Sequence, residues 1–237
     1  MSKMSQMQGL LWKVKKLAFR LEELTLLPIQ ADTLGLYPIC PMRSFLTFLL
    51  NLFPYAQWKL KFRDGLTKED LQHVGMRAFS PISVIPRPKG EIIPKVRLGL
   101  PLPRRIQVEA TEFQVQGKLN DVMENENKGE VRVIEYRITD DEEVPPLLWE
   151  RAKLQARIKT WILSQYQDGV KAPSVAIINE NKRRIPVQEL VPYSNEETRN
   201  KLHSILHDFL RSENLEKVEE VCEECRIKDI CSKLTSF

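Results

Sequence analysis

The sequence lacks any apolar run long enough to cross a membrane, and basic residues interrupt the hydrophobic stretch near its start. These absences argue against a membrane-spanning or secreted protein, so we predict a cytoplasmic protein with no membrane partner. There is also no internal repeat and no low-complexity tract. The 237 residues, 42% hydrophobic and 29% charged, have an ordinary globular balance and can form one large or two small domains.

Cysteine is scarce, with four residues in the whole chain. Cys40 stands alone, whereas Cys222, Cys225 and Cys231 form a C-x2-C-x5-C group near the end. Reduced thiols in a cytoplasmic protein favour a metal over disulfides, and four thiolates satisfy either a [4Fe–4S] cluster or a structural zinc ion. Two disulfides or unrelated core thiols are the alternatives, and the spacing alone does not distinguish iron from zinc.

Positive charge exceeds negative charge by only four, which is compatible with nucleic acid binding but does not establish it. Part of this charge lies along one predicted helix, at Arg151, Lys153, Arg157 and Lys159. We interpret these residues as a path for the phosphates of DNA. Because they occupy more than one face of the helix, some of them must be ordinary solvated charge.

Hydrophobic periodicity predicts an α/β fold. A helical period is expected over about residues 9–27, 44–53, 67–78, 146–167 and 195–211. A period of two predicts strands at 106–122, 131–139, 174–179 and 185–190, and the first two are expected to form a hairpin. We therefore predict an N-terminal helical region with a proline-rich connection (1–103), a core (104–212) and a C-terminal cysteine segment (213–237).

The predicted hairpin carries the residues best suited to catalysis. Asp121 lies near the end of one strand, and alternation places Glu135 and Arg137 on one face of the next. Carboxylates beside a basic side chain can hold Mg²⁺ or Mn²⁺, which polarises a phosphate and activates a water. The alternative is a solvent-facing strand with a local ion pair.

Three segments follow one another as Gly117-Lys-Leu-Asn-Asp121, Val133-Ile-Glu135-Tyr-Arg137 and Gln155. They resemble the three motifs of RecB-type PD-(D/E)XK nucleases. With Cys40-Pro-Met-Arg43 upstream and the cysteine group downstream, the chain is similar to the CRISPR-associated RecB-like exonucleases that bind an iron–sulfur cluster. The resemblance extends from about residue 37 to residue 231, which is most of the chain.

This resemblance implies a restriction-endonuclease-like fold, in which a mixed sheet is flanked by helices. It implies a metal-dependent exonuclease that acts on single-stranded DNA ends, in CRISPR spacer acquisition beside the integrase proteins. It also implies a [4Fe–4S] cluster that clamps two distant segments through Cys40, Cys222, Cys225 and Cys231.

The resemblance further assigns roles to individual residues. Asp121 and Glu135 would hold the Mn²⁺ or Mg²⁺ ion, with His73 as a third ligand. Arg137 would stabilise the pentavalent phosphate, and Gln155 would orient the site.

The sequence departs from the family pattern at three positions, where Asn120, Arg137 and Lys159 replace an aspartate, a lysine and a tyrosine. A shift of one residue turns a strand side chain to the other face, so Asp121 serves only where a bulge or strand end re-aims it. Arginine cannot deprotonate to help activate water. These departures support a second hypothesis, a DNA- or protein-binding module that keeps the fold and cluster without hydrolysis. A third hypothesis is a zinc-stapled DNA-binding protein unrelated to nucleases.

Overall fold

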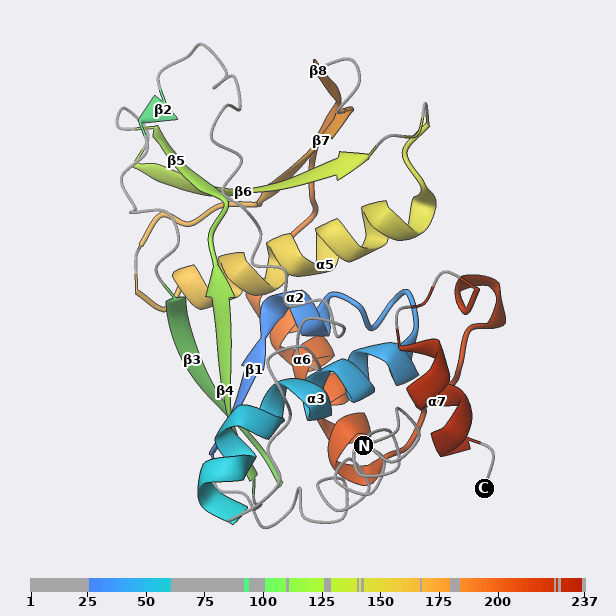
Figure 1. Cartoon of the computed structure of the whole chain (residues 1–237). Coiled ribbons are helices and arrows are strands. Elements are labelled where there is room, and N and C mark those ends of the chain that lie inside the picture. Colours follow the sequence, from blue (N-terminus) through green and yellow to red (C-terminus); the bar gives the residue numbers. More distant parts are fainter. Residues whose placement is uncertain are drawn as a thin grey trace.

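The computed structural model describes residues 26–60, 92–93, 101–109, 111–125, 129–139, 141, 143–166, 168–179, 184–223, 225 and 227–235. These residues form a mixed α/β fold in which two mixed sheets are flanked by helices (Figure 1). The helix expected at 67–78 lies outside the described residues, as does most of the one expected at 9–27. Residues 26 and 27 belong to a strand instead.

The first sheet joins the N-terminal part of the chain to the core. It has the order β1 (Leu26–Gln30), β4 (Thr111–Lys118), β3 (Pro101–Val108). β1 is parallel to β4, whereas β3 and β4 are antiparallel. The region expected to be helical therefore also contributes strands, and its sequence showed no strand periodicity because β1 is only five residues long.

The second sheet has five strands in the order β2 (Ile92–Ile93), β5 (Asp121–Asn125), β6 (Glu130–Thr139), β7 (Ser174–Asn179), β8 (Arg184–Leu190). β6 and β7 are parallel, and the helix α5 (Pro146–Leu163) connects them. The other neighbouring strands are antiparallel. This arrangement makes β6 the central strand of the sheet, where both its edges are paired.

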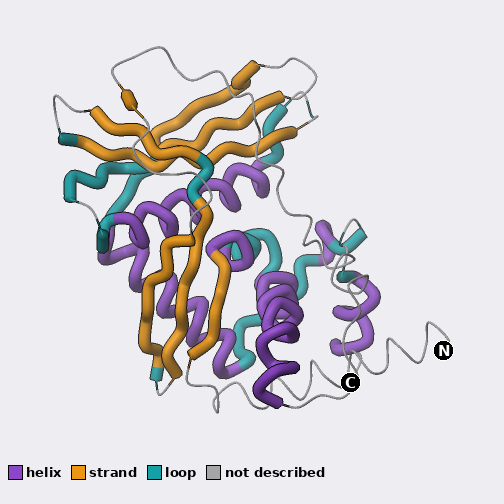
Figure 2. The backbone as a smooth tube through the Cα atoms, turned by 60° about the vertical axis from the view of Figure 1, so that its left-hand side comes forward, coloured by secondary structure: helices purple, strands orange, loops and turns teal. Residues whose placement is uncertain are grey.

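The single strand expected at 106–122 is wrong, because the chain breaks there twice. Glu109 has a φ of 52°, and this left-handed residue turns the chain back to form the β3–β4 hairpin. At Leu119 and Asn120 the chain leaves the first sheet and enters the second, as Figure 2 shows. The apolar alternation continues through both breaks, so the sequence pattern did not reveal them.

Helix α5 packs between the two sheets and contacts strands of both. Pro146 at its first turn suits the helix start, since proline has a preset φ and lacks an N–H that would remain unpaired there. Trp161 of this helix is buried and packs in the apolar core. The helix ends at Leu163, before the expected position of 167.

The largest apolar core lies between the first sheet and two further helices, α3 (Pro41–Leu60) and α6 (Asn195–Arg211). Phe48 of α3 stacks on Phe209 of α6, with ring centroids 5.4 Å apart, and also contacts Phe113 of β4. Helix α6 begins with a side-chain cap, because Ser194 accepts a hydrogen bond from the Glu197 N–H at 3.3 Å. Across the described residues, no helix combines the length and apolar character needed to cross a membrane.

Candidate active site

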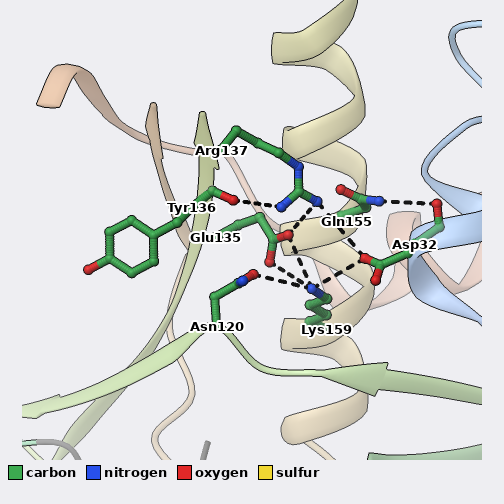
Figure 3. Close-up of polar contacts among 7 residues, drawn as sticks. All are labelled: Asp32, Asn120, Glu135, Tyr136, Arg137, Gln155 and Lys159. Atoms are coloured by element: carbon green, nitrogen blue, oxygen red, sulfur yellow. Dashed lines mark hydrogen bonds and ion pairs between the residues drawn. The ribbon is translucent and has the colours of Figure 1, made fainter. Parts of the chain in front are cut away.

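Glu135 lies in the middle of β6 with 0% of its surface exposed. Alternation places the Arg137 side chain on the same face, which is directed toward α5 (Figure 3). Arg137 is only 7% exposed, and its Nη2 lies 2.5 Å from Glu135 Oε1. The ion pair therefore exists, but the alternative of a solvent-facing strand is wrong.

A second cation reaches Glu135 from α5. The Lys159 Nζ donates to Oε2 at 2.8 Å and to Oε1 at 3.1 Å. Its aliphatic stem passes Gly117, where an added Cβ would lie 3.2 Å from Lys159 Cγ. Lys159 was expected as one of several basic residues along the helix, whereas the structure places it inside the site.

A second carboxylate comes from an element that the sequence analysis did not identify. Asp32 lies on the four-residue helix α2 (Ala31–Leu34), which follows β1 directly. Its Oδ1 is 3.5 Å from Lys159 Nζ and 3.9 Å from Arg137 Nη2. A helix this short has no periodicity to detect, and the only available signal was an acidic residue immediately after an apolar segment.

Gln155 joins α5 to α2. It is completely buried, and its Nε2 donates to the Asp32 carbonyl oxygen at 3.1 Å. Gly35 makes this approach possible, because a Cβ at that position would lie 2.3 Å from Gln155 Cγ. The orienting role expected for Gln155 is compatible with this contact, which fixes the backbone that carries Asp32.

Asn120 approaches Glu135 from the break between the two sheets. With its oxygen inward, Asn120 Oδ1 lies 3.4 Å from Lys159 Nζ, as drawn in Figure 3. With the amide reversed, its nitrogen donates to the two Glu135 oxygens at 3.0 and 2.6 Å. We assign the reversed orientation, because an amide oxygen facing a carboxylate would be repelled by it.

Two of the expected metal ligands, Asp121 and His73, lie partly or wholly outside the described residues. The register pairs Asp121 with Ile134 on β6, but the side chain of Asp121 lies outside the described part. His73 also falls in a segment that the structure does not describe. Both assignments therefore stay predictions.

Further positive charge surrounds this group. Burial lowers the pKa of Arg151 to about 10, and the neighbouring positive charges of Arg137 and Arg43 lower it as well. The other basic residues of α5 point elsewhere, since Lys153 pairs with Glu150 and Glu189, and Arg157 donates to the Pro192 carbonyl oxygen. The expected DNA path thus divides, and only Arg151 and Lys159 belong to the site.

The cysteines gather at a separate place, where the segment around Cys40 lies beside the C-terminal segment. The Met42 N–H donates to the Glu216 carbonyl oxygen at 3.4 Å, and Val218 and Val221 pack against the apolar cluster that contains Cys40. Burial raises the pKa of the Cys231 thiol, and the charges of the other three cysteines raise it further, whereas Lys217 opposes them. The four thiols are therefore electrostatic neighbours, although they come from opposite ends of the sequence.

None of the four cysteines is in a disulfide, and the described residues contain no group of three or more His, Cys, Asp or Glu side chains arranged to hold a metal ion. The donor set still suits a thiolate-bound metal in number and type, because four sulfurs are what zinc and cubane iron–sulfur clusters require. Cys222 lies on the turn after the short 3-10 helix η2 (Glu219–Val221), and Cys231 lies on α7 (Lys228–Thr235).

The side chains of Asp32, Glu135 and Lys159 bring two carboxylates and an amine together between β6 and α5. Asp32 and Glu135 each place an oxygen within 3.5 Å of the same Lys159 nitrogen. Oxygens that surround an ammonium group in this way can also surround a hard divalent cation.

No protein-family model matches this chain, and no curated protein matches it either. Among solved structures, the crystal structure of SSO0001 is similar, with a TM-score of 0.52 and 17% sequence identity. The alignment covers 95% of this chain and 96% of that one. At this identity the similarity concerns the fold alone, and it extends over nearly the whole of both chains.

Proposed function

We propose that the protein is a metal-dependent DNA exonuclease of the RecB type, with a restriction-endonuclease-like fold, acting on single-stranded DNA ends. One observation carries this proposal. The carboxylates of Asp32 and Glu135 and the amine of Lys159 meet between β6 and α5. Two acids and a lysine are the side chains that PD-(D/E)XK motifs supply, and here they come from three separate elements.

The two carboxylates fit Mn²⁺ or Mg²⁺, because both already direct oxygens at one cationic atom. Asp32 and Glu135 would hold the ion once the Lys159 side chain withdraws, and Asn120 would offer its amide oxygen after rotation. His73 and Asp121 remain candidates for further ligands. A bound ion would polarise the phosphate and lower the pKa of a water.

Lys159 takes the role that the family assigns to the lysine of the E-x-K motif. Arg137 occupies that motif position here, and a guanidinium cannot accept a proton at neutral pH. Lys159 supplies the lysine that the motif uses, and its Nζ lies 2.8 Å from the Glu135 carboxylate. Arg137 is then left to stabilise charge on the phosphate, and Gln155 keeps Asp32 in position through its bond to the backbone.

The four cysteines complete the proposal as ligands of a [4Fe–4S] cluster. The proximity of Cys40 to the C-terminal segment supports it, because a cluster there would hold α3 to the end of the chain. Its role would be structural. Following the resemblance, the biological setting would be spacer acquisition in CRISPR immunity, with the integrase proteins as partners.

Cleavage of end-labelled single-stranded DNA by anaerobically purified protein tests the proposal. We expect degradation in the presence of Mn²⁺, and its loss in Glu135→Gln and Asp32→Asn. Glu150→Gln is the matched control, because this exposed residue of α5 lies outside the site. Equal cleavage by all four proteins would identify a contaminant or a misplaced site.

A second function is favoured by a specific observation. Both oxygens of Glu135 are already paired with internal cations, and the residue is fully buried. A buried carboxylate neutralised in this way no longer needs a metal. The protein would then be a DNA- or protein-binding homologue without hydrolytic activity.

Binding of Mn²⁺, measured by electron paramagnetic resonance, separates the two functions. The nuclease is expected to bind Mn²⁺ in the wild type, and Lys159→Met should retain the ion while losing cleavage. The binding module is expected to bind Mn²⁺ only after Lys159→Met removes the competing ammonium. In that second case the wild type should still bind DNA without any divalent ion.

A further inference from the structure

The site between β6 and α5 contains more positive than negative charge. Arg137 and Lys159 contact the two carboxylates of Asp32 and Glu135, and the charges of Arg43 and Arg137 both act on the neighbouring Arg151. Among the described residues of this group, four cations therefore outnumber two carboxylates. Unbalanced charge in a poorly solvated position is costly unless an anion joins it.

Helical geometry shows where the unbalanced charge lies. Arg151, Gln155 and Lys159 follow one another at intervals of four residues, so they share one face of α5. Gln155 and Lys159 of this face contact Asp32 and Glu135. Arg151 continues the same face toward the start of the helix, about 12 Å along its axis from Lys159.

Hydrogen bonding also indicates that the unbalanced charge lies at Arg151. The Nε atom of Arg151 is buried and has no hydrogen-bond acceptor among the described residues. Arg151 and Arg43 as whole side chains are only half-buried, so a ligand can reach them from solvent. Arg43 lies in the first turn of α3, where its N–H donates to the Cys40 Sγ at 3.4 Å.

We propose that Arg151 and Arg43, beside Arg137, bind the terminal phosphate of a DNA strand that passes the Glu135 site. This inference rests on the proposed action on DNA ends and adds the group by which an end would be recognised. A terminal phosphate monoester carries a charge of about −1.5 to −2 at neutral pH, which matches an excess of two positive charges. An internal phosphodiester carries one negative charge and would leave part of the excess unbalanced. The planar guanidinium fork also suits the several oxygens of a phosphate.

The test measures binding of single-stranded DNA without divalent metal, so that no cleavage occurs. Fluorescence anisotropy would compare strands with a 5′-phosphate, a 3′-phosphate or hydroxyl ends. We expect the wild type to bind one phosphorylated end about tenfold more tightly than the hydroxyl end, since charge-assisted pairing is involved. Inorganic phosphate in excess should abolish this preference, because it competes for the same arginines.

Variants on α5 and α3 show which residues cause the preference for a phosphorylated end. Arg151→Gln and Arg43→Gln should each remove the preference, whereas Arg151→Lys keeps a cation and should retain part of it. Lys153→Gln is the control, because this residue of α5 pairs with surface carboxylates and should weaken all three strands equally. Circular dichroism of each variant shows that it is folded.

Equal binding of phosphorylated and hydroxyl ends by the wild type would overturn the inference. So would a preference that survives in both Arg151→Gln and Arg43→Gln. The readout is independent of the nuclease assay. A protein that prefers phosphorylated ends but never cleaves with Mn²⁺ would refute the nuclease activity and support the phosphate site. Cleavage without any preference for phosphorylated ends would support the nuclease activity and refute the phosphate site.

Discussion

Glu135 carries a carboxylate into a position that water does not reach, and its environment determines what that carboxylate can do. Lys159 and Arg137 both lie within hydrogen-bonding distance of it. A buried charge that loses a partner is strongly destabilising, because neither water nor another group can replace the lost interaction. The stability of the protein should therefore depend on this cluster as much as its chemistry does.

Replacing Lys159 by methionine tests this dependence. We expect Lys159→Met to lower the free energy of unfolding by about 3 kcal/mol, the lower end of the range for breaking a buried pair, because Arg137 remains. Urea denaturation followed by circular dichroism measures the change. Adding Glu135→Gln should recover part of the loss, since the two residues interact directly. Lys153→Met, which removes a partly exposed surface lysine, should cost less than about 0.5 kcal/mol.

Arg151 should behave in the opposite way. It is buried at Nε without an acceptor and is repelled by Arg137 and Arg43. Burial lowers its pKa to about 10, so the charged form is disfavoured in the folded state and the penalty is fully present below pH 10. We expect Arg151→Met to raise the stability at pH 7 by about 1 kcal/mol, or roughly 2–4 °C in melting temperature. A lower melting temperature would show that Arg151 is an internal structural partner rather than a ligand-binding group.

At the scale of elements, the contact between α2 and α5 decides where Asp32 lies. Gly35 ends α2 with an ordinary helical φ of −62°, so the conformation itself does not require glycine. Glycine is required here by the lack of space, because a Cβ at position 35 would lie 2.3 Å from Gln155 Cγ and 2.6 Å from its Cδ. Gln155 is fully buried and bonded to the Asp32 carbonyl, so it cannot simply turn away.

Gly35→Ala should therefore separate α2 from α5. We expect a loss of about 2 kcal/mol in unfolding free energy from overpacking. Displacement of Asp32 should also weaken Mn²⁺ binding. Gln155→Ala in the same protein should restore much of the stability, since it removes the clashing atoms. If Gly35→Ala alone leaves both stability and metal binding unchanged, the close approach of the two helices is wrong.

The elements differ in how well the sequence predicts them, and the difference has a physical cause. The start of α6 was predictable because Ser194 and Glu197 form a local cap. β7 was predictable from its uninterrupted apolar residues, and Glu135 and Arg137 from alternation along β6. The break at Leu119 and Asn120 was not, because the change from one sheet to the other depends on long-range pairing. The contribution of Asp32 depends on the same kind of contact, made by a helix too short to leave a pattern.

At the scale of the whole molecule, the segment around Cys40 lies beside the C-terminal segment. Val218 and Val221 pack against the apolar cluster that contains Cys40, and α7 contacts α3. A metal centre at this junction would close a loop that includes the whole second sheet, strands β3 and β4 of the first sheet, and the site residues Glu135 and Lys159. Closing so long a loop is worth about 4–5 kcal/mol in the chain-entropy description used for disulfides, and a metal clip acts on the same unfolded-state entropy.

Substitution of one cysteine tests whether such a centre exists. We expect the anaerobically purified wild type to show the broad visible absorbance of an iron–sulfur cluster, and Cys231→Ser to lose it. The melting temperature should fall at the same time by about 10 °C, the shift that a loss of roughly 4 kcal/mol produces in a domain of this size. Ser232→Ala is the control, because its neighbouring position on α7 is exposed.

The outcome also separates the remaining possibilities for this junction. The wild type could instead be colourless and contain zinc, with both zinc and stability lost in Cys231→Ser. That result would identify a structural zinc ion in place of the iron–sulfur cluster. Wild-type protein without any metal would leave Cys40 and Cys231 as core residues, because both are already buried in apolar surroundings. In that case serine at position 231 should cost only the burial of one hydroxyl, about 1–3 kcal/mol, and Cys222→Ser should cost less because Cys222 is half-exposed. A metal centre predicts instead that the two substitutions are equally damaging, since each removes one ligand from the same ion or cluster.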